Sequence, residues 1–150
     1  PARPVGCRRG IALATRGATT LAGAEACRDE RLGQMGKAAE FWDRLSQVYA
    51  TADTADIPDL YANDALYLEP YNPPHRGNLL IQAYLKDWIR GKDDIEVQAK
   101  RVIEGPDEAE LAVEWTISYT AAGRRWSDLP RASFFGFDDD GRVIYHRDYT

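Results

Sequence analysis

The chain has 150 residues, 44% of them hydrophobic and 29% charged, and its formal net charge at pH 7 is −5. This length and apolar content suit one globular domain with a hydrophobic core and leave no room for a second. The apolar runs fall far short of the roughly 20 residues that a membrane-spanning helix needs, and the scattered acidic charge offers nucleic acid no basic face. The sequence therefore predicts a soluble protein that binds neither membranes nor nucleic acid.

The first 34 residues differ in composition from the rest of the chain. They are rich in Ala, Gly, Thr and Arg, lack aromatic residues and contain both cysteines, Cys7 and Cys27. An Arg-rich, acid-poor leader is typical of targeting peptides, but the only methionine, Met35, stands directly before the first periodic segment and favours a natural start there. We predict that residues 1–34 form a poorly structured leader or read-through segment and that residues 35–150 form the domain. A domain without cysteine fits the reducing cytoplasm.

Three helices are predicted in the first half of the domain. Apolar residues at three- and four-residue spacing predict an amphipathic helix over residues 37–53. A shorter helix is predicted within residues 56–64, where Pro58 suits the first turn. The third helix is expected to start at Asn78, as its cap, and to stop at Gly91.

Alternating polar and apolar residues predict strands elsewhere. The expected strands cover residues 65–69, 95–104, 110–120, 124–137 and 142–150. We expect a break or bend at Pro130, and the unfinished alternation at Thr150 predicts that a tail follows. Helices followed by a run of strands indicate the α+β class, here a curved antiparallel or mixed sheet wrapped around about three N-terminal helices, with a pocket inside.

One carboxylate stands at a strand end, where a rigid loop begins. In the run ALYLEPYNPPHRG, Glu69 directly precedes Pro70, which restricts the Glu69 backbone to extended geometry. At a period of two, Tyr67 shares the face of Glu69. In an apolar pocket the pKa of such a carboxyl group rises toward neutrality, so that the group can take and return a proton. The alternatives are that Glu69 faces solvent or pairs with Arg76.

Two stretches of the chain carry a family resemblance. The run LYANDALYLEP with the proline-rich loop and HRG, and the closing run FFGFDDDGRVIYHRDYT, resemble the SnoaL-like polyketide cyclases of the nuclear transport factor 2-like superfamily. The resemblance covers roughly residues 41–150, and its most specific piece is the end of the last hairpin. The superfamily also contains ketosteroid isomerases and limonene-epoxide hydrolases. The resemblance implies a cone-shaped α+β barrel with an apolar cavity, usually assembled as a homodimer.

The resemblance also implies roles for three residues. Glu69 falls where the isomerases hold the carboxylate that shuttles a proton. Asp148 falls where cyclases and epoxide hydrolases hold an acid in the last strand, and His146, two residues earlier on the same face, matches a histidine of the cyclases. The alternatives are an ion pair for Asp148 with a nearby arginine and a satisfied polar role for His146.

The sequence departs from both enzyme patterns at four positions. Leu45 and Ser133 stand where the isomerases hold their oxyanion-hole tyrosine and neutral acid. Trp115 and Ile117 stand where the epoxide hydrolases hold an arginine and an aspartate. These departures argue against either of those exact reactions.

Aromatic and apolar side chains can line a pocket for a flat polycyclic substrate, although such residues pack in cores whether or not a ligand exists. We assign to the substrate pocket Tyr67, Tyr84, Trp115, Ile117, Trp126, Ser133 and Phe135. No cofactor is predicted, because the sequence has no glycine-rich phosphate loop. No metal site is predicted either, since the two histidines, His75 and His146, do not stand at ligand spacing.

The sequence thus predicts a cofactor-independent acid/base enzyme of the cyclase or isomerase type, with an epoxide-hydrolase-like reaction as a variant. Its substrate is expected to be a small hydrophobic carbonyl or polyketide-like molecule. Glu69 and Asp148 are the predicted proton-transfer pair, in one buried cavity and with at least one raised pKa. The alternative from another class is a non-catalytic ligand-binding or dimerisation module of the same fold.

Overall fold

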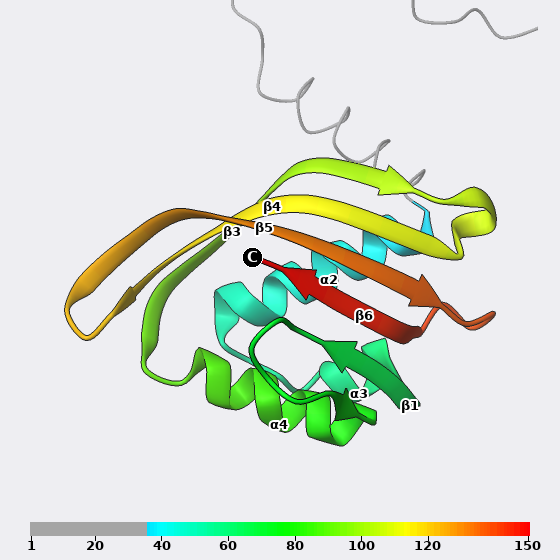
Figure 1. Cartoon of the computed structure of the whole chain (residues 1–150), viewed down its shortest axis with the longest axis horizontal. Helices are drawn as coiled ribbons and strands as arrows, with labels where there is room; N and C mark the ends of the chain where they lie inside the picture. The colour runs from blue at the N-terminus through cyan, green and yellow to red at the C-terminus, as the bar shows by residue number, and fades with distance from the viewer. Residues whose placement is uncertain (1–35) are drawn as a thin grey trace, which may run out of the picture. The chain divides into compact units, whose positions relative to one another are not determined.

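The computed structural model describes residues 36–150, so the leader predicted for residues 1–34 lies outside the described residues. Within them, helices cover one face of a curved sheet of six strands (Figure 1). The helices are α2 (Lys37–Thr51), α3 (Ile57–Leu60) and α4 (Asn78–Ile89), with a 3-10 turn, η1 (Pro106–Glu108). The strands are β1 (Tyr61–Leu68), β2 (His75–Arg76), β3 (Lys92–Glu104), β4 (Glu110–Ala121), β5 (Arg124–Phe137) and β6 (Val143–Tyr149).

The sheet is mixed, with the strand order β2-β1-β6-β5-β4-β3. Neighbouring strands pair antiparallel except β1 and β6, which are parallel. This architecture confirms the α+β cone predicted from the sequence. The parallel pair matters for function, because it sets Tyr67 of β1 opposite His146 of β6.

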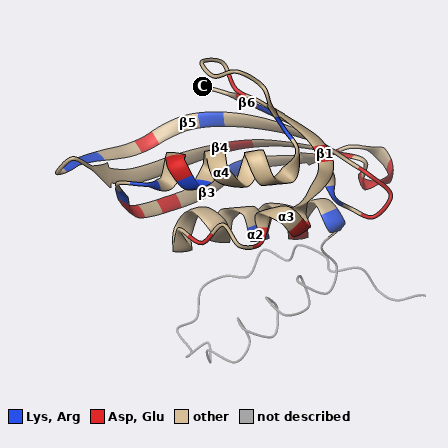
Figure 2. Cartoon of the chain, turned by 90° about the horizontal axis from the view of Figure 1, so that it is seen from below, with Lys and Arg blue, Asp and Glu red and all other residues tan. Residues whose placement is uncertain are grey.

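The hydrophobic core lies between the helices and the sheet. The apolar stripe of α2 is buried, and the ring of Phe41 meets Phe135 and Phe137 edge-on at centroid distances of 4.9 and 5.2 Å. The predicted alternation of β4 holds, with Leu111, Val113, Trp115 and Ile117 buried. Figure 2 shows charges of both signs spread over the helices and strands. Polar side chains on the covered face of the sheet are therefore interior residues.

The second predicted helix is much shorter than expected. It was predicted within residues 56–64, but α3 ends at Leu60 and β1 begins at Tyr61 instead of Ala65. Tyr61 pairs with Val143 of β6 and its side chain is fully buried. Tertiary pairing thus overrides the local helical pattern.

Asn78 does not act as the predicted helix cap. Gly77 holds the cap position of α4, with φ 93°, and a Cβ there would lie 3.1 Å from the backbone oxygen of Asn63. The Asn78 amide instead donates hydrogen bonds to the Pro58 carbonyl and to Asn63 Oδ1, at 3.2 and 3.1 Å. Asn78 therefore ties the start of α4 to α3 and β1.

The predicted bend at Pro130 is wrong in position. Strand β5 runs on through Pro130, which pairs with Thr116 of β4. Strand β6 pairs with β5 only from Ala132 onward, so the missing amide hydrogen of Pro130 costs no hydrogen bond to β6. The irregularity lies at Asp128, with φ 52°, and the Asp128 amide donates to Ser118 Oγ at 2.9 Å.

Strand β6 also departs from simple alternation. A register shift near the Gly136–Phe137 end of its pairing with β5 leaves Ile144 exposed and buries Val143. Strict alternation along β6 predicts that Val143 and His146 face opposite sides of the sheet. In the structure both side chains are buried. Beyond this bulge the alternation resumes, and His146 and Asp148 point inward.

Candidate active site

Asp148 lies at the centre of a buried hydrogen-bond network. Its Oδ2 accepts a hydrogen bond from the Tyr67 hydroxyl at 2.6 Å. Its Oδ1 accepts one from Ser133 Oγ and lies 2.8 Å from His146 Nε2. The three partners come from β1, β5 and β6, so adjacent strands of the sheet build the network.

His146 stands behind Asp148. Its side chain is only 2% exposed, and its ring stacks on Tyr67 at a centroid distance of 4.3 Å, with Phe135 at the same distance on a tilted plane. Its Nδ1 lies 2.9 Å from the Tyr61 hydroxyl, so both ring nitrogens have partners. In this arrangement His146 can influence a ligand only through Asp148.

Ser133 links the hydrogen-bond network of Asp148 to strand β4. The Trp115 indole N–H donates to Ser133 Oγ at 2.9 Å, and the serine hydroxyl donates to Asp148. Ser133 is 1% exposed. It is thus a positioning group for the carboxylate and not a direct ligand contact.

The network keeps Asp148 ionised. Burial by itself would raise the pKa of Asp148, but the charge and hydrogen bond of His146, with the hydrogen bonds from Ser133 and Tyr67, hold it below its usual range. The expected raised pKa is therefore wrong for this carboxylate. Burial, and then the charge of Asp148, raise the pKa of the Tyr67 phenol well above its usual range, so it remains a donor.

Glu69 directly follows β1 and shares a small cavity with Asp148. This inner cavity measures about 20 Å³, and its lining includes Tyr67, Trp115 and Arg131 beside the two carboxylates. A space of this size holds roughly one water molecule. The described residues contain no ion pair between Glu69 and Arg76. The structure thus brings the two predicted catalytic carboxylates to the lining of one cavity.

A larger outer pocket adjoins the inner cavity. It measures about 500 Å³ and shares Glu69, Trp88 and Arg131 with the inner cavity. Tyr84 lines the outer pocket, and burial raises the pKa of its phenol, with the hydrogen bond and charge of Glu69 raising it further. The outer pocket has the volume expected of a site for a small organic molecule.

Comparison with known proteins identifies the family. Residues 42–146, most of the chain, match the family model described as SnoaL-like domain. The chain belongs to the SnoaL-like domain family. No curated protein matches it. The earlier resemblance to SnoaL-like proteins is thereby confirmed.

Solved structures show the same fold. An LEH-like epoxide hydrolase from M. tuberculosis is 21% identical, with a TM-score of 0.62 over 75% of this chain and 81% of that one. A steroid delta-isomerase from Pseudomonas aeruginosa is 22% identical, with a TM-score of 0.57 over 76% and 79%. A hypothetical protein with a ketosteroid isomerase-like fold from Catenulispora acidiphila, in complex with trimethylamine, is 12% identical, with a TM-score of 0.65 over 74% and 85%. At these identities the likeness concerns the fold alone.

The residues assigned to the substrate pocket of this SnoaL-like domain divide into three groups. Tyr67 and Trp115 line the inner cavity, and Tyr84 lines the outer pocket. Ser133, Phe135 and Ile117 are buried behind the lining, in the network or the core. Trp126 lies on β5 away from both spaces, 37% exposed, with the Arg124 guanidinium 4.2 Å from its ring centroid.

Sequence reasoning missed four lining residues of the inner cavity. Tyr49, Leu85, Trp88 and Arg131 line it but were not assigned to the site. A signal for Arg131 was present, because at a period of two it shares the strand face of Ser133 and Phe135, which were both assigned to the pocket.

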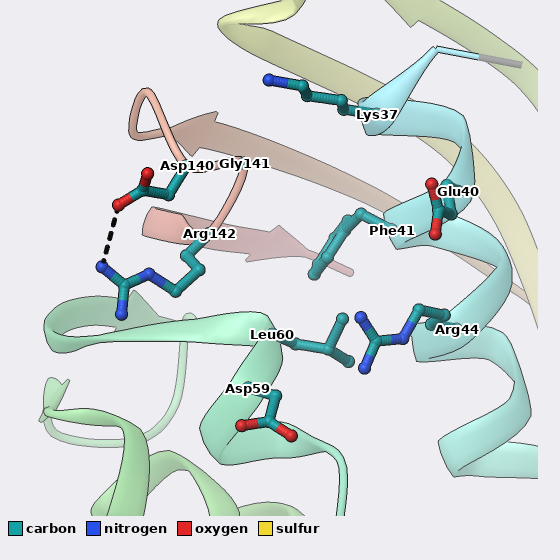
Figure 3. A pocket seen from close by; sticks show the side chains of 9 residues that line it. All are labelled: Lys37, Glu40, Phe41, Arg44, Asp59, Leu60, Asp140, Gly141 and Arg142. Atoms are coloured by element: carbon teal, nitrogen blue, oxygen red, sulfur yellow. Dashed lines mark hydrogen bonds and ion pairs between the residues drawn. The ribbon is translucent and has the colours of Figure 1, made fainter.

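A second pocket, of about 210 Å³, lies among α2, α3 and the β5–β6 turn of the domain (Figure 3). Both arginines of its lining are engaged in ion pairs, Arg142 with Asp138 and Asp140 and Arg44 with Asp56, each at 3.4 Å. We therefore place the candidate active site in the interior.

Two further features of the described residues bear on function. No helix among residues 36–150 is long and apolar enough to cross a membrane. Within the same range, no three His, Cys, Asp or Glu side chains gather in a group that could hold a metal ion.

Proposed function

We propose that this protein is a cofactor-independent acid/base enzyme of the cyclase or isomerase type, acting on a small hydrophobic carbonyl or polyketide-like substrate. The observation that carries the proposal is the shared inner cavity, onto which Glu69 and Asp148 both face beside aromatic side chains. Two carboxylates in different environments are suited to different proton-transfer roles. We also predict that the protein acts in the cytoplasm.

The two carboxylates take distinct roles in this proposal. Asp148 enters the reaction ionised, because its three hydrogen-bond donors stabilise the charged form. It is the general base, toward a substrate proton or toward a water in the inner cavity. Glu69 lies where the inner cavity meets the outer pocket and exchanges the second proton with the substrate.

A proton-exchange measurement tests the proposal without knowledge of the natural substrate. A panel of cyclic and aromatic ketones is incubated with the protein in D₂O, and loss of the signal of the protons alpha to the carbonyl is followed by NMR. We expect faster exchange of at least one ketone with the unchanged protein and a loss of about 100-fold or more with Glu69→Gln. Exchange equal to the buffer rate for every ketone, and no turnover of a parallel panel of epoxides, would contradict the proposal.

One observation favours a non-catalytic alternative. The hydrogen bonds of Asp148 are satisfied within the protein, and its pKa is lowered instead of raised, as in a structural charge network. In that case the domain binds a small hydrophobic molecule in the outer pocket without changing it. Ligand binding without proton exchange would favour this alternative.

We also propose that the protein forms a homodimer through the sheet face that the helices leave open. Ile103 and Phe134 are 50% and 48% exposed and line one shallow groove of about 150 Å³. Tyr149, 44% exposed, meets Phe134 edge-on at 5.7 Å. Exposed apolar patches of this kind mark interaction surfaces, and a second copy of the same face would bury them.

A further inference from the structure

Arg131 is a cation on the walls of both spaces that no hydrogen bond or ion pair engages among the described residues. Its guanidinium lines both the inner cavity and the outer pocket. Among the described residues it makes no hydrogen bond and no ion pair, whereas the nearby Arg125 on the same strand binds Glu96 at 2.8 Å and the Asp94 carbonyl at 2.7 Å. An arginine carries five donors in a fixed planar fork, so Arg131 holds unused capacity at the site.

The Asp148 carboxylate beside Arg131 is already engaged. Asp148 accepts hydrogen bonds from Tyr67 and Ser133 and lies against His146. Glu69 raises the pKa of the Tyr84 phenol, which lines the same outer pocket. The walls therefore offer a ligand the Glu69 carboxylate for proton exchange and the guanidinium of Arg131 for binding an anion.

The charge of Arg131 reaches the interior of the domain. Burial raises the pKa of the Tyr49 phenol, the charge of Asp148 raises it further, and the charge of Arg131 opposes this rise. Arg131 is also only partly exposed, which weakens solvent screening of its interactions. An anionic group that enters the outer pocket would meet a cation that is neither paired nor fully hydrated.

The surroundings of Arg131 suit an anion attached to an apolar ring. The outer pocket brings together Tyr84, Trp88 and Leu129 on the same lining as Arg131. A guanidinium binds a carboxylate through two parallel hydrogen bonds, while the aromatic and aliphatic walls bury a flat skeleton.

We propose that Arg131 anchors the substrate through a carboxylate, so that the natural ligand is an aromatic or polycyclic carboxylic acid. The proposal rests on the proposed function for the identity of the site, but not on catalysis. The carboxylate would bind at the guanidinium and the ring would lie along the outer pocket. The reacting end would then meet Glu69 at the entrance to the inner cavity.

Binding of a matched pair of probes tests this assignment. The probes are 2-naphthoate and 2-naphthamide, which share a ring system and differ in charge, and affinities are measured by titration calorimetry. We expect the unchanged protein to bind the acid about tenfold to hundredfold more tightly than the amide, as hydrogen bonds to a charged partner typically yield. In Arg131→Gln the ratio should fall to about one through weaker binding of the acid, and Arg131→Lys should retain part of it.

Arg125→Gln is the matched control, because it removes the same charge from the same strand outside both spaces. It should leave the ratio unchanged. Equal affinities in the unchanged protein, failure of both probes to bind, or a ratio that survives Arg131→Gln would overturn the assignment.

The outcome is separable from that of the proposed function. Asp148→Asn should abolish proton exchange and keep the preference for the acid. A preserved preference without any proton exchange in the unchanged protein would support the anchor and contradict the enzyme. Proton exchange that depends on Asp148, combined with equal probe affinities, would support the enzyme and contradict the anchor.

Discussion

Tyr67→Phe isolates one hydrogen bond of the candidate active site. The substitution removes the hydroxyl that donates to Asp148 Oδ2 at 2.6 Å but keeps the ring that stacks on His146. A hydrogen bond to a charged group contributes about 1.5–3 kcal/mol. The inner cavity beside Asp148 has room for roughly one water that could replace the donor. We therefore expect a loss at the lower end of this range, about 1.5–2 kcal/mol of unfolding free energy at pH 7.

The loss should depend on pH with a definite sign. The Tyr67 hydrogen bond is among the causes that hold the pKa of Asp148 below its usual value in the folded protein. Stability from such a depressed pKa is present above the unfolded value, about 3.9, and is lost as the pH falls through the folded pKa. The difference between the unchanged protein and Tyr67→Phe should therefore shrink as the pH falls below about 4.

Urea unfolding at pH values from 7 down to 2 measures both effects. Tyr145→Phe is the control, because Tyr145 is a partly exposed residue of β6 for which no hydrogen-bond partner is found among residues 36–150. It should change stability by less than about 0.5 kcal/mol. A neutral Tyr67→Phe variant, or a loss that stays constant with pH, would refute the description of Asp148 as a carboxylate held ionised by its donors.

Three further predictions concern stability and assembly. Asp148→Asn should make the unfolding free energy decline less steeply as the pH falls below about 4. Urea unfolding at several acid pH values would contradict this if the free energy falls with pH as steeply as in the unchanged protein. Phe134→Asp should shift the mass measured by light scattering from dimer to monomer, whereas Leu79→Asp, on the exposed side of α4, should leave the mass unchanged. A monomeric unchanged protein would refute the proposed interface. Gly77→Ala should lower the thermal midpoint more than Gly91→Ala, because both have positive φ but only Gly77 has a backbone oxygen 3.1 Å from the added Cβ; equal losses would contradict a steric role for Gly77.

Local sequence signals predict the elements of the fold well where periodicity is strong. Helix α2 and strand β4 follow their predicted patterns closely, because each has one face against the core. Local sequence signals wrongly place Tyr61 in a helix, since it joins a strand by pairing with residues about eighty positions later in the chain. The bulge in β6 is likewise set by its partner strand and not by its own alternation.

The site could be predicted in part. Glu69 stands out because Pro70 fixes its backbone at the strand end, and family resemblance points to Asp148 and His146. The direction of the Asp148 pKa shift could not be predicted, because its donors come from β1, β5 and β6 and meet only in the folded sheet. Arg131 escaped notice because a strand arginine in a sequence is ordinarily a solvated residue.

The most direct test of the central claim is a double-mutant cycle on Glu69 and Asp148. Rates of ketone proton exchange and epoxide opening are compared for Glu69→Gln, Asp148→Asn and the double variant, with Asp64→Asn, an exposed residue of β1, as control. A proton-transfer pair predicts losses of about 100-fold or more for each single variant, and a double variant that loses little beyond the worse of the two. Circular dichroism and urea unfolding establish that each variant is folded. Unchanged rates in either single variant would contradict the account.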